Sequence, residues 1–146
     1  MKRLAIFILT AMCLASCGVP NTLYYWGGTR NGATTYEHLA YKLYDKQTPE
    51  SICKLLCMYE DLVKHPGGTR RVPPPGICAE YGYMLLIPEN AEIFAKNATN
   101  LQKKVYRSND YASIFPEMGK KMLLKEIELY PESAKFIEPL IERLCN

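Results

Sequence analysis

Prolines divide most of this chain into short segments. Pro49, Pro88, Pro116 and Pro131 each stand where a new run of apolar residues at helical spacing begins. Proline suits the first position of a helix, because its ring presets the backbone angle and its missing N–H has no partner there. No stretch clearly alternates apolar and polar residues in the way that a half-buried strand does. We therefore expect an all-α chain, built from successive short antiparallel hairpins of helices.

Six helices are expected, beginning near residues 34, 49, 77, 88, 116 and 131. Thr34 and Glu37 have the spacing of a capping box, which marks the start of the first helix. The apolar stripe of the second helix consists of Ile52, Leu55, Leu56, Tyr59 and Val63. The fourth helix is expected to carry Phe94, Ala98, Leu101 and Val105 on one face. Pro139 should kink or interrupt the last helix, because a proline inside a helix removes one backbone hydrogen bond.

The N-terminus has the layout of a secretory signal peptide. A cationic head, Met1-Lys2-Arg3, precedes an apolar run of about a dozen residues that ends in small residues. This run is too short for a helix that spans a bilayer, which needs roughly 20 apolar residues. Leu14-Ala15-Ser16-Cys17 resembles the bacterial lipobox, in which the cysteine is lipidated and cleavage falls just before it. We therefore expect residues 1–16 to be removed and Cys17 to carry a lipid anchor.

This processing predicts three parts of the chain. They are a signal peptide of residues 1–16, a lipidated tether of residues 17–33 with an aromatic cluster, and a helical-repeat-like domain of residues 34–146. Gly18 rather than aspartate follows the cysteine, which under the sorting rule of many Gram-negative lipoproteins indicates the outer membrane. Loss of Lys2 and Arg3 lowers the net charge from +3 to +1. Neither this charge nor the secretory address favours a nucleic-acid partner.

Four cysteines remain after processing: Cys53, Cys57, Cys78 and Cys145. Disulfides persist in an oxidising compartment, so we consider a disulfide among them. Cys53 and Cys57 lie four residues apart on one expected helix, where a mutual bridge has poor geometry. Each would pair more readily with Cys78 or Cys145. The alternative is that some of the four are simply small buried apolar residues.

One motif favours an enzymatic function for this chain. Ser51-Ile52-Cys53-Lys54 matches the S-x-x-K signature of penicillin-binding enzymes, but those enzymes also need S-D-N and K-T-G motifs for proton transfer and substrate binding. Neither is present in this sequence. The match is therefore read as a coincidence on an amphipathic helix.

A thiol hydrolase or a metal site would need cysteine beside histidine. Cys57 or Cys78 could serve as the nucleophile with His38 or His65, although no local signature supports the pairing. The C-x3-C spacing and the two scattered histidines match no ligand pattern for a metal. We therefore expect no catalysis, no metal, no cofactor and no small-molecule substrate.

Two exposed-looking features are candidate partner-binding sites. The first is the aromatic cluster of Tyr24, Tyr25 and Trp26, since tryptophan and tyrosine are enriched at interfaces. It could also form a platform for cell-wall glycan, or pin the tether to its own helical core, and we favour the last of these interpretations. The second is the basic pair Arg70 and Arg71 in a loop that cannot be helical. This pair is either solvated or meets anionic headgroups or an acidic partner.

Parts of the helical region resemble tetratricopeptide repeats. Residues 122–134, "MLLKEIELYPESA", are similar to the second helix of such a repeat, and Tyr81-Gly82-Tyr83 is similar to the first. Gly119 is suitably small for the point where the two helices would cross. The distance between the two halves exceeds the usual repeat, so an insertion, for example in residues 97–115, is needed.

A more specific resemblance covers nearly the whole mature chain. The order of the lipobox, "LYYWG", Pro-Gly before "CAEYGYML", and "EIELYPESAKF" resembles a family of uncharacterised bacterial lipoproteins, domain of unknown function 4810. The stretch between residues 88 and 116 is longer than the family pattern. The resemblance implies a periplasmic, outer-membrane-associated lipoprotein that works with other lipoproteins in a curli-secretion-like assembly system, with no catalysis.

The sequence therefore predicts a lipid-anchored adaptor or scaffold that binds a protein or peptide in the groove of its hairpins. Two alternatives stay open: a structural envelope lipoprotein whose aromatic cluster contacts peptidoglycan, and a small envelope hydrolase.

Overall fold

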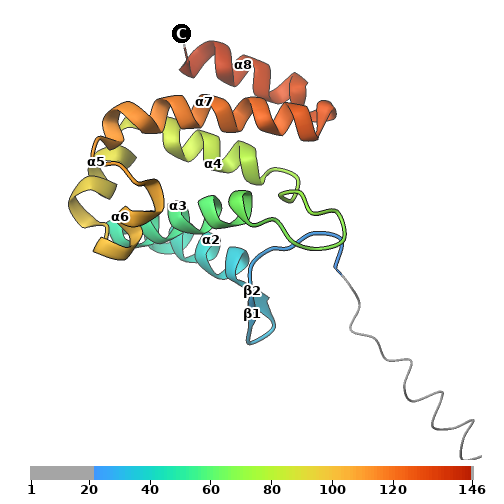
Figure 1. The fold of residues 1–146 in the computed structure, drawn as a ribbon, viewed down its shortest axis with the longest axis horizontal. Helices are drawn as coiled ribbons and strands as arrows, with labels where there is room; N and C mark the ends of the chain where they lie inside the picture. The colour runs from blue at the N-terminus through green and yellow to red at the C-terminus, as the bar shows by residue number, and fades with distance from the viewer. Residues whose placement is uncertain (1–21, 146) are drawn as a thin grey trace, which may run out of the picture.

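The computed structural model describes residues 22–145, and this part of the chain is mostly helical (Figure 1). The predicted signal peptide and the predicted lipidation site at Cys17 lie outside the described residues. The helices are α2 (Thr35–Lys46), α3 (Pro49–Lys64), α4 (Ile77–Leu86), α5 (Pro88–Asn97), α6 (Asn100–Tyr106), α7 (Tyr111–Leu129) and α8 (Ala134–Leu144). The 3-10 turn η1 (Pro131–Ser133) and the two-residue strands β1 (Thr29–Arg30) and β2 (Ala33–Thr34) complete the fold. The prediction of an all-α chain is confirmed.

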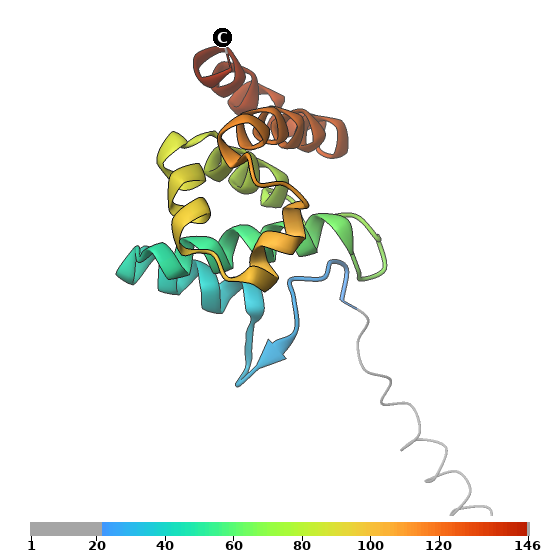
Figure 2. The same ribbon diagram turned by 60° about the vertical axis from the view of Figure 1, so that its left-hand side comes forward.

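Five of the helices form a stack that runs through the molecule. α2 packs on α3, α3 on α4, α4 on α7 and α7 on α8 (Figure 1). α5 and α6 lie to one side of this stack, where both contact α3 and α5 also contacts α7 (Figure 2). Because the main partner of α4 is α7 and not the next helix along the chain, the order of packing differs from a simple series of hairpins. The tetratricopeptide-like arrangement stays a prediction.

Capping residues explain where the first two helices begin. The Thr34 side chain accepts from the backbone N–H of Glu37, whose own side chain accepts from Thr34, so the expected capping box is present. Thr48 accepts from the N–H of Ser51 and Pro49 follows it at the first helical position. Such caps satisfy backbone donors that the first turn of a helix leaves free.

The fourth expected helix is in fact two helices. Thr99 forms a second capping box with Gln102, which ends α5 at Asn97 and starts α6 at Asn100. The change of direction separates the residues that were expected to share one face. Phe94 is fully buried, whereas Leu101 is 77% exposed.

Pro116 and Pro139 both lie inside helices. α7 begins at Tyr111 and not at Pro116, because Asp110 caps it by accepting from the N–H of Ser113. Buried Tyr111 and Phe115 anchor the turn before Pro116 in the core. Pro139 lies inside α8, which continues to Leu144, so the expected interruption is absent.

The small hairpin of β1 and β2 was not expected. Asn31 and Gly32 form its turn, and both have positive φ angles, of 53° and 81°. Asn-Gly between two short extended segments is the strongest sequence signal for such a turn. The hairpin is too short to show the alternation by which strands are usually recognised.

The core lies between α3, α4, α5 and α7. Its largest fully buried side chains include Tyr81, Phe94 and Phe115. α4 and α7 approach closely because glycines face each other where they cross: a Cβ on Gly82 would lie 2.8 Å from the carbonyl oxygen of Gly119. The small residue expected at this crossing is therefore present.

Candidate protein-binding groove

An apolar groove of about 500 Å³ lies over α3, between α2 and α4. α2 supplies Ala40, Leu43, Tyr44 and Gln47, α3 supplies Ile52, Leu55 and Tyr59, and α4 with the start of α5 supplies Glu80, Tyr83, Met84, Ile87 and Asn90. The groove exists because α2 packs mainly on α3, reaches α4 through the hydrogen bonds from Tyr36 to Glu80, and has no buried residue of its own. One side of α2 therefore stays open.

Two tyrosines stand exposed on opposite walls of this groove. Tyr44 on α2 is 85% exposed and Tyr83 on α4 is 46% exposed. Tyr44 has the helical spacing of a core residue, but it stays exposed because nothing packs over that side of α2. Tyrosine offers a large apolar ring with a polar tip, and it is enriched among residues that dominate binding interfaces.

Glu80 is the one charged residue that lines the groove. The Tyr36 hydroxyl of α2 donates to both carboxylate oxygens of Glu80 at 2.9 Å, and the Tyr59 hydroxyl of α3 donates to Oε2 at 2.6 Å. Burial and the nearby carboxylate raise the pKa of Tyr36 to about 12, and the same causes raise the pKa of Tyr59. Both hydroxyls therefore stay protonated at neutral pH and hold the carboxylate in place.

The end of the groove away from Glu80 is closed by the buried side-chain amide of Asn90. Asn90 Nδ2 donates to the carbonyl oxygen of Met84 at 2.7 Å, which fixes the link between α4 and α5. Gln47, the left-handed C-cap of α2, lines this same end. Polar groups thus mark both ends, with apolar side chains between them.

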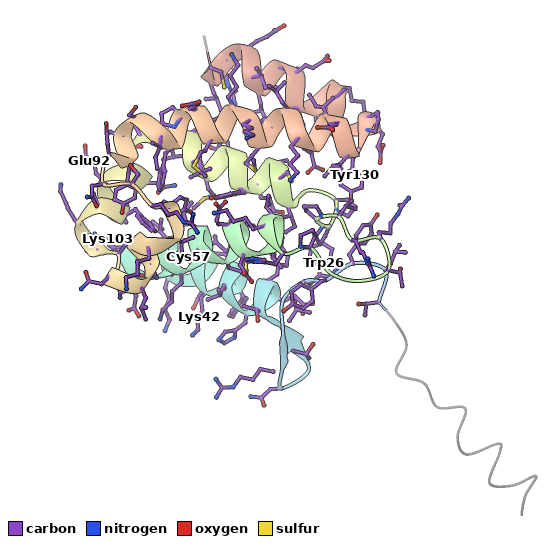
Figure 3. All side chains as sticks on the ribbon, viewed as in Figure 1. Trp26, Lys42, Cys57, Glu92, Lys103 and Tyr130 are labelled. Atoms are coloured by element: carbon purple, nitrogen blue, oxygen red, sulfur yellow. The ribbon has the colours of Figure 1, made fainter. Side chains whose placement is uncertain are left out.

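The predicted aromatic cluster lies outside the groove and attaches the N-terminal segment to the helical core. The Trp26 ring packs on Tyr36 with centroids 5.1 Å apart, and Tyr24 packs edge-on against Tyr130 at 6.4 Å. Trp26 and Tyr130 lie at the same end of the molecule (Figure 3). Tyr25 is partly exposed, with its Cβ against Gly67. These contacts agree with the interpretation that the cluster pins the tether.

The basic loop holds the same segment. The backbone N–H groups of Thr69 and Arg70 donate to the carbonyl oxygens of Thr22 and Leu23, at 3.1 and 3.2 Å. The Arg70 guanidinium also donates to the Tyr24 hydroxyl at 3.1 Å. Arg70 is therefore engaged within the chain, while its neighbour Arg71 is exposed with a positive φ of 53°.

No disulfide joins the four cysteines, which are all free in the described chain. Cys53 is buried beside the carbonyl oxygen of Ile93 on α5, and Cys78 is buried at the start of α4. The described chain therefore contains no disulfide: Cys53 and Cys78 are buried on different helices, whereas Cys57 and Cys145 are partly exposed. Burial raises the pKa of both Cys57 and Cys78 to about 12, which leaves little of the reactive thiolate at neutral pH.

The S-x-x-K match is not assembled as a nucleophile and base. The Ser51 hydroxyl donates to the carbonyl oxygen of Thr48 at 2.8 Å, as part of the helix cap. Lys54 pairs instead with Glu50 at 2.6 Å. His65 contacts Asp61 at 2.9 Å on the exposed side of α3. Within residues 22–145, no group of three or more His, Cys, Asp or Glu side chains is placed to hold a metal ion.

Sequence reasoning missed Glu80 and its two tyrosines. A signal was present, because Glu80 is the single charge in the otherwise apolar segment "ICAEYGYMLL". Its partner Tyr59 is buried, as its place on the apolar stripe predicts, and its partner Tyr36 is partly buried against the core.

Comparison with models of protein families, with curated proteins and with solved structures gives no match for this chain. Of the helices in the described part of the chain, none has both the length and the apolar character needed to cross a bilayer.

Proposed function

We propose that this protein is a lipid-anchored adaptor of the bacterial outer membrane, which binds a segment of a partner protein in the groove between α2 and α4. The observation that carries the proposal is the groove itself, an open apolar surface flanked by exposed Tyr44 and Tyr83. Grooves between helices are a recurrent way to bind a peptide or an amphipathic helix. The motifs of residues 14–17 support the anchor.

A lipid on Cys17 would hold the helical core close to the membrane surface. Cys17 precedes Thr22 by five residues, so even a fully extended chain separates them by at most about 18 Å. Thr22 is bonded to the loop that contains Arg70 and Arg71. A lipid on Cys17 would keep that loop near the membrane surface, where exposed Arg71 suits anionic headgroups. Other envelope lipoproteins of a curli-secretion-like assembly are the partners that the family resemblance favours.

Affinity purification with matched tyrosine variants tests this proposal. A C-terminally tagged chain is purified from detergent-solubilised membranes as wild type, Cys17→Ala, Tyr44→Glu and Tyr41→Glu, and co-purifying proteins are identified by mass spectrometry. Tyr41 and Tyr44 are both exposed on α2, at 70% and 85%, but only Tyr44 lines the groove. The comparison therefore separates a groove contact from a general effect of charge on α2.

The expected result is that the same envelope proteins accompany the wild type and Tyr41→Glu and are lost with Tyr44→Glu. Loss with Cys17→Ala would add that the anchor assembles the complex. Equal recovery from Tyr44→Glu and Tyr41→Glu would overturn binding in the groove, and attention would then pass to glycan binding at Trp26.

A further inference from the structure

We propose that the groove selects partner segments that carry a lysine or arginine, whose cation pairs with Glu80. The inference rests on the proposed function, since it requires that the groove binds a partner, and it adds the chemistry by which that partner is recognised.

The first argument is charge. Glu80 is the sole charged residue lining the groove, and no lysine or arginine of residues 22–145 lies within ion-pair distance of it. Its hydrogen-bond donors are the neutral hydroxyls of Tyr36 and Tyr59. Its negative charge is therefore not neutralised by a neighbour. A cation brought by a partner would supply the missing counter-charge through a charge-assisted hydrogen bond.

The second argument is preorganisation. α2, α3 and α4 each contribute one member of the group formed by Tyr36, Tyr59 and Glu80, so the carboxylate is fixed from two sides before any partner arrives. An isolated surface glutamate loses side-chain freedom when it forms an ion pair, which removes much of the gain. Glu80 has already lost that freedom, yet it stays exposed and accessible. An ion pair with a partner's cation therefore contributes more binding free energy at Glu80 than at an ordinary surface acid.

The third argument is spacing. Glu80 and Ile87 mark opposite ends of one wall and lie seven residues apart, or about 10 Å along a helix. Between them the walls present Tyr83, Met84 and Leu43. The partner segment should therefore place its cation about 10 Å from the apolar side chain that reaches Ile87. This distance corresponds to about seven residues in a helical partner and about three in an extended one.

Selection from a random peptide library tests this inference. A phage-displayed library of 12-residue peptides is panned on the full processed chain in detergent, and enriched peptides are made with a fluorescent label. Their affinity is measured by fluorescence anisotropy for the wild type, Glu80→Gln, Glu89→Gln and Tyr44→Glu. Glu89 is an exposed acid at the start of α5 that does not line the groove, so its variant matches the loss of charge alone. Glutamine keeps an oxygen to accept from Tyr59.

We expect enriched peptides to combine apolar residues with a lysine or arginine. Their binding should weaken about tenfold with Glu80→Gln and stay unchanged with Glu89→Gln. Replacing the lysine or arginine of the peptide by methionine should also weaken binding to the wild type about tenfold. The same replacement should not weaken binding to Glu80→Gln any further. Such coupling identifies a direct pair between the two side chains.

The outcomes separate the two proposals. Peptides that lose binding with Tyr44→Glu but bind Glu80→Gln as well as the wild type would overturn the role of Glu80 and leave the groove standing. If the peptides bind Tyr44→Glu and Glu80→Gln as well as the wild type, or if no peptide is enriched, the proposal that the groove binds a partner is overturned. The inference about Glu80 then falls with it.

Discussion

Gly82 of α4 and Gly119 of α7 meet backbone to backbone. A Cβ on Gly82 would lie 2.8 Å from the carbonyl oxygen of Gly119, and a Cβ on Gly119 would lie 2.9 Å from the carbonyl oxygen of Gly82. Real Cβ atoms essentially never approach a neighbour so closely, and backbone atoms cannot swing aside as a flexible side chain can. The close packing of α4 on α7 therefore depends on the absence of two side chains.

Adding a methyl group at this crossing should destabilise the protein. We expect Gly82→Ala and Gly119→Ala each to lower the free energy of unfolding by about 1–3 kcal/mol or more, because α4 and α7 must separate. Urea denaturation followed by circular dichroism gives the measurement. Gly28→Ala is the control, since its new Cβ would meet nothing closer than 3.9 Å. Equal stability of all three variants would contradict the packing described at the crossing.

The buried carboxylate of Glu126 predicts how the stability of the fold depends on pH. Its carboxylate on α7 is buried and accepts from the N–H of Gly76 at 2.7 Å, so it caps α4, which has no cap of its own. Burial raises the pKa of Glu126, and the backbone N–H groups of Gly76, Cys78 and Ala79 only partly offset this. A raised pKa means that the folded state binds the proton more tightly than the unfolded state does.

The stability that this proton contributes is fully present below the unfolded pKa of about 4.3 and is lost as the pH rises through the raised pKa. We therefore expect the stability of the wild type relative to Glu126→Gln to fall as the pH rises above about 4.3 and then to level off. Thermal denaturation at a series of pH values measures it, with the exposed Glu128→Gln as control. A relative stability that rises with pH would refute the assignment.

Trp26 should govern how tightly the N-terminal segment is held. Its ring packs on Tyr36 and its carbonyl oxygen accepts from the N–H of Tyr36 at 3.1 Å. We expect Trp26→Ala to lower the free energy of local opening of the N-terminal segment by about 1–2 kcal/mol. Hydrogen exchange should become faster at the amides of Thr35 and Tyr36 and stay unchanged where α4 meets α7. Leu23→Ala, at an exposed position, serves as the control, and unchanged exchange in Trp26→Ala would count against the docking.

The cysteines provide a chemical test of the core. In the processed chain unfolded without reductant, all four thiols, Cys53, Cys57, Cys78 and Cys145, should react with a thiol reagent, because none is in a disulfide. In the folded chain at pH 8, Cys57 and Cys78 should react more than about 10³-fold more slowly than a free thiol, since a pKa near 12 leaves little thiolate. Recovery of only two thiols after unfolding would show a disulfide.

Much of the helical content could be predicted, because the signals are local. Thr34, Thr48 and Pro49 mark helix starts through bonds within three residues, and the structure confirms them. The same reasoning failed where two local signals competed. Pro116 was taken as a helix start, although Asp110 had already capped that helix, and the cap at Thr99 was overlooked.

The groove could not be predicted, because it depends on which helices lie side by side. Tyr44 has the periodicity of a core residue, and only the position of α2 at one end of the stack leaves it exposed. Glu80 meets Tyr36 and Tyr59 across 44 and 21 residues of sequence. No spacing pattern in a single sequence reports contacts of that range.

The attachment of the N-terminal segment has a mechanical consequence. A pull on the chain at Thr22 is borne first by the backbone bonds from Thr69 to Thr22 and from Arg70 to Leu23, and then by the Trp26 contact. The loop that receives this load joins α3 to α4, the two helices that form the floor and one wall of the groove. Tension along the tether would therefore enter the molecule beside its binding surface.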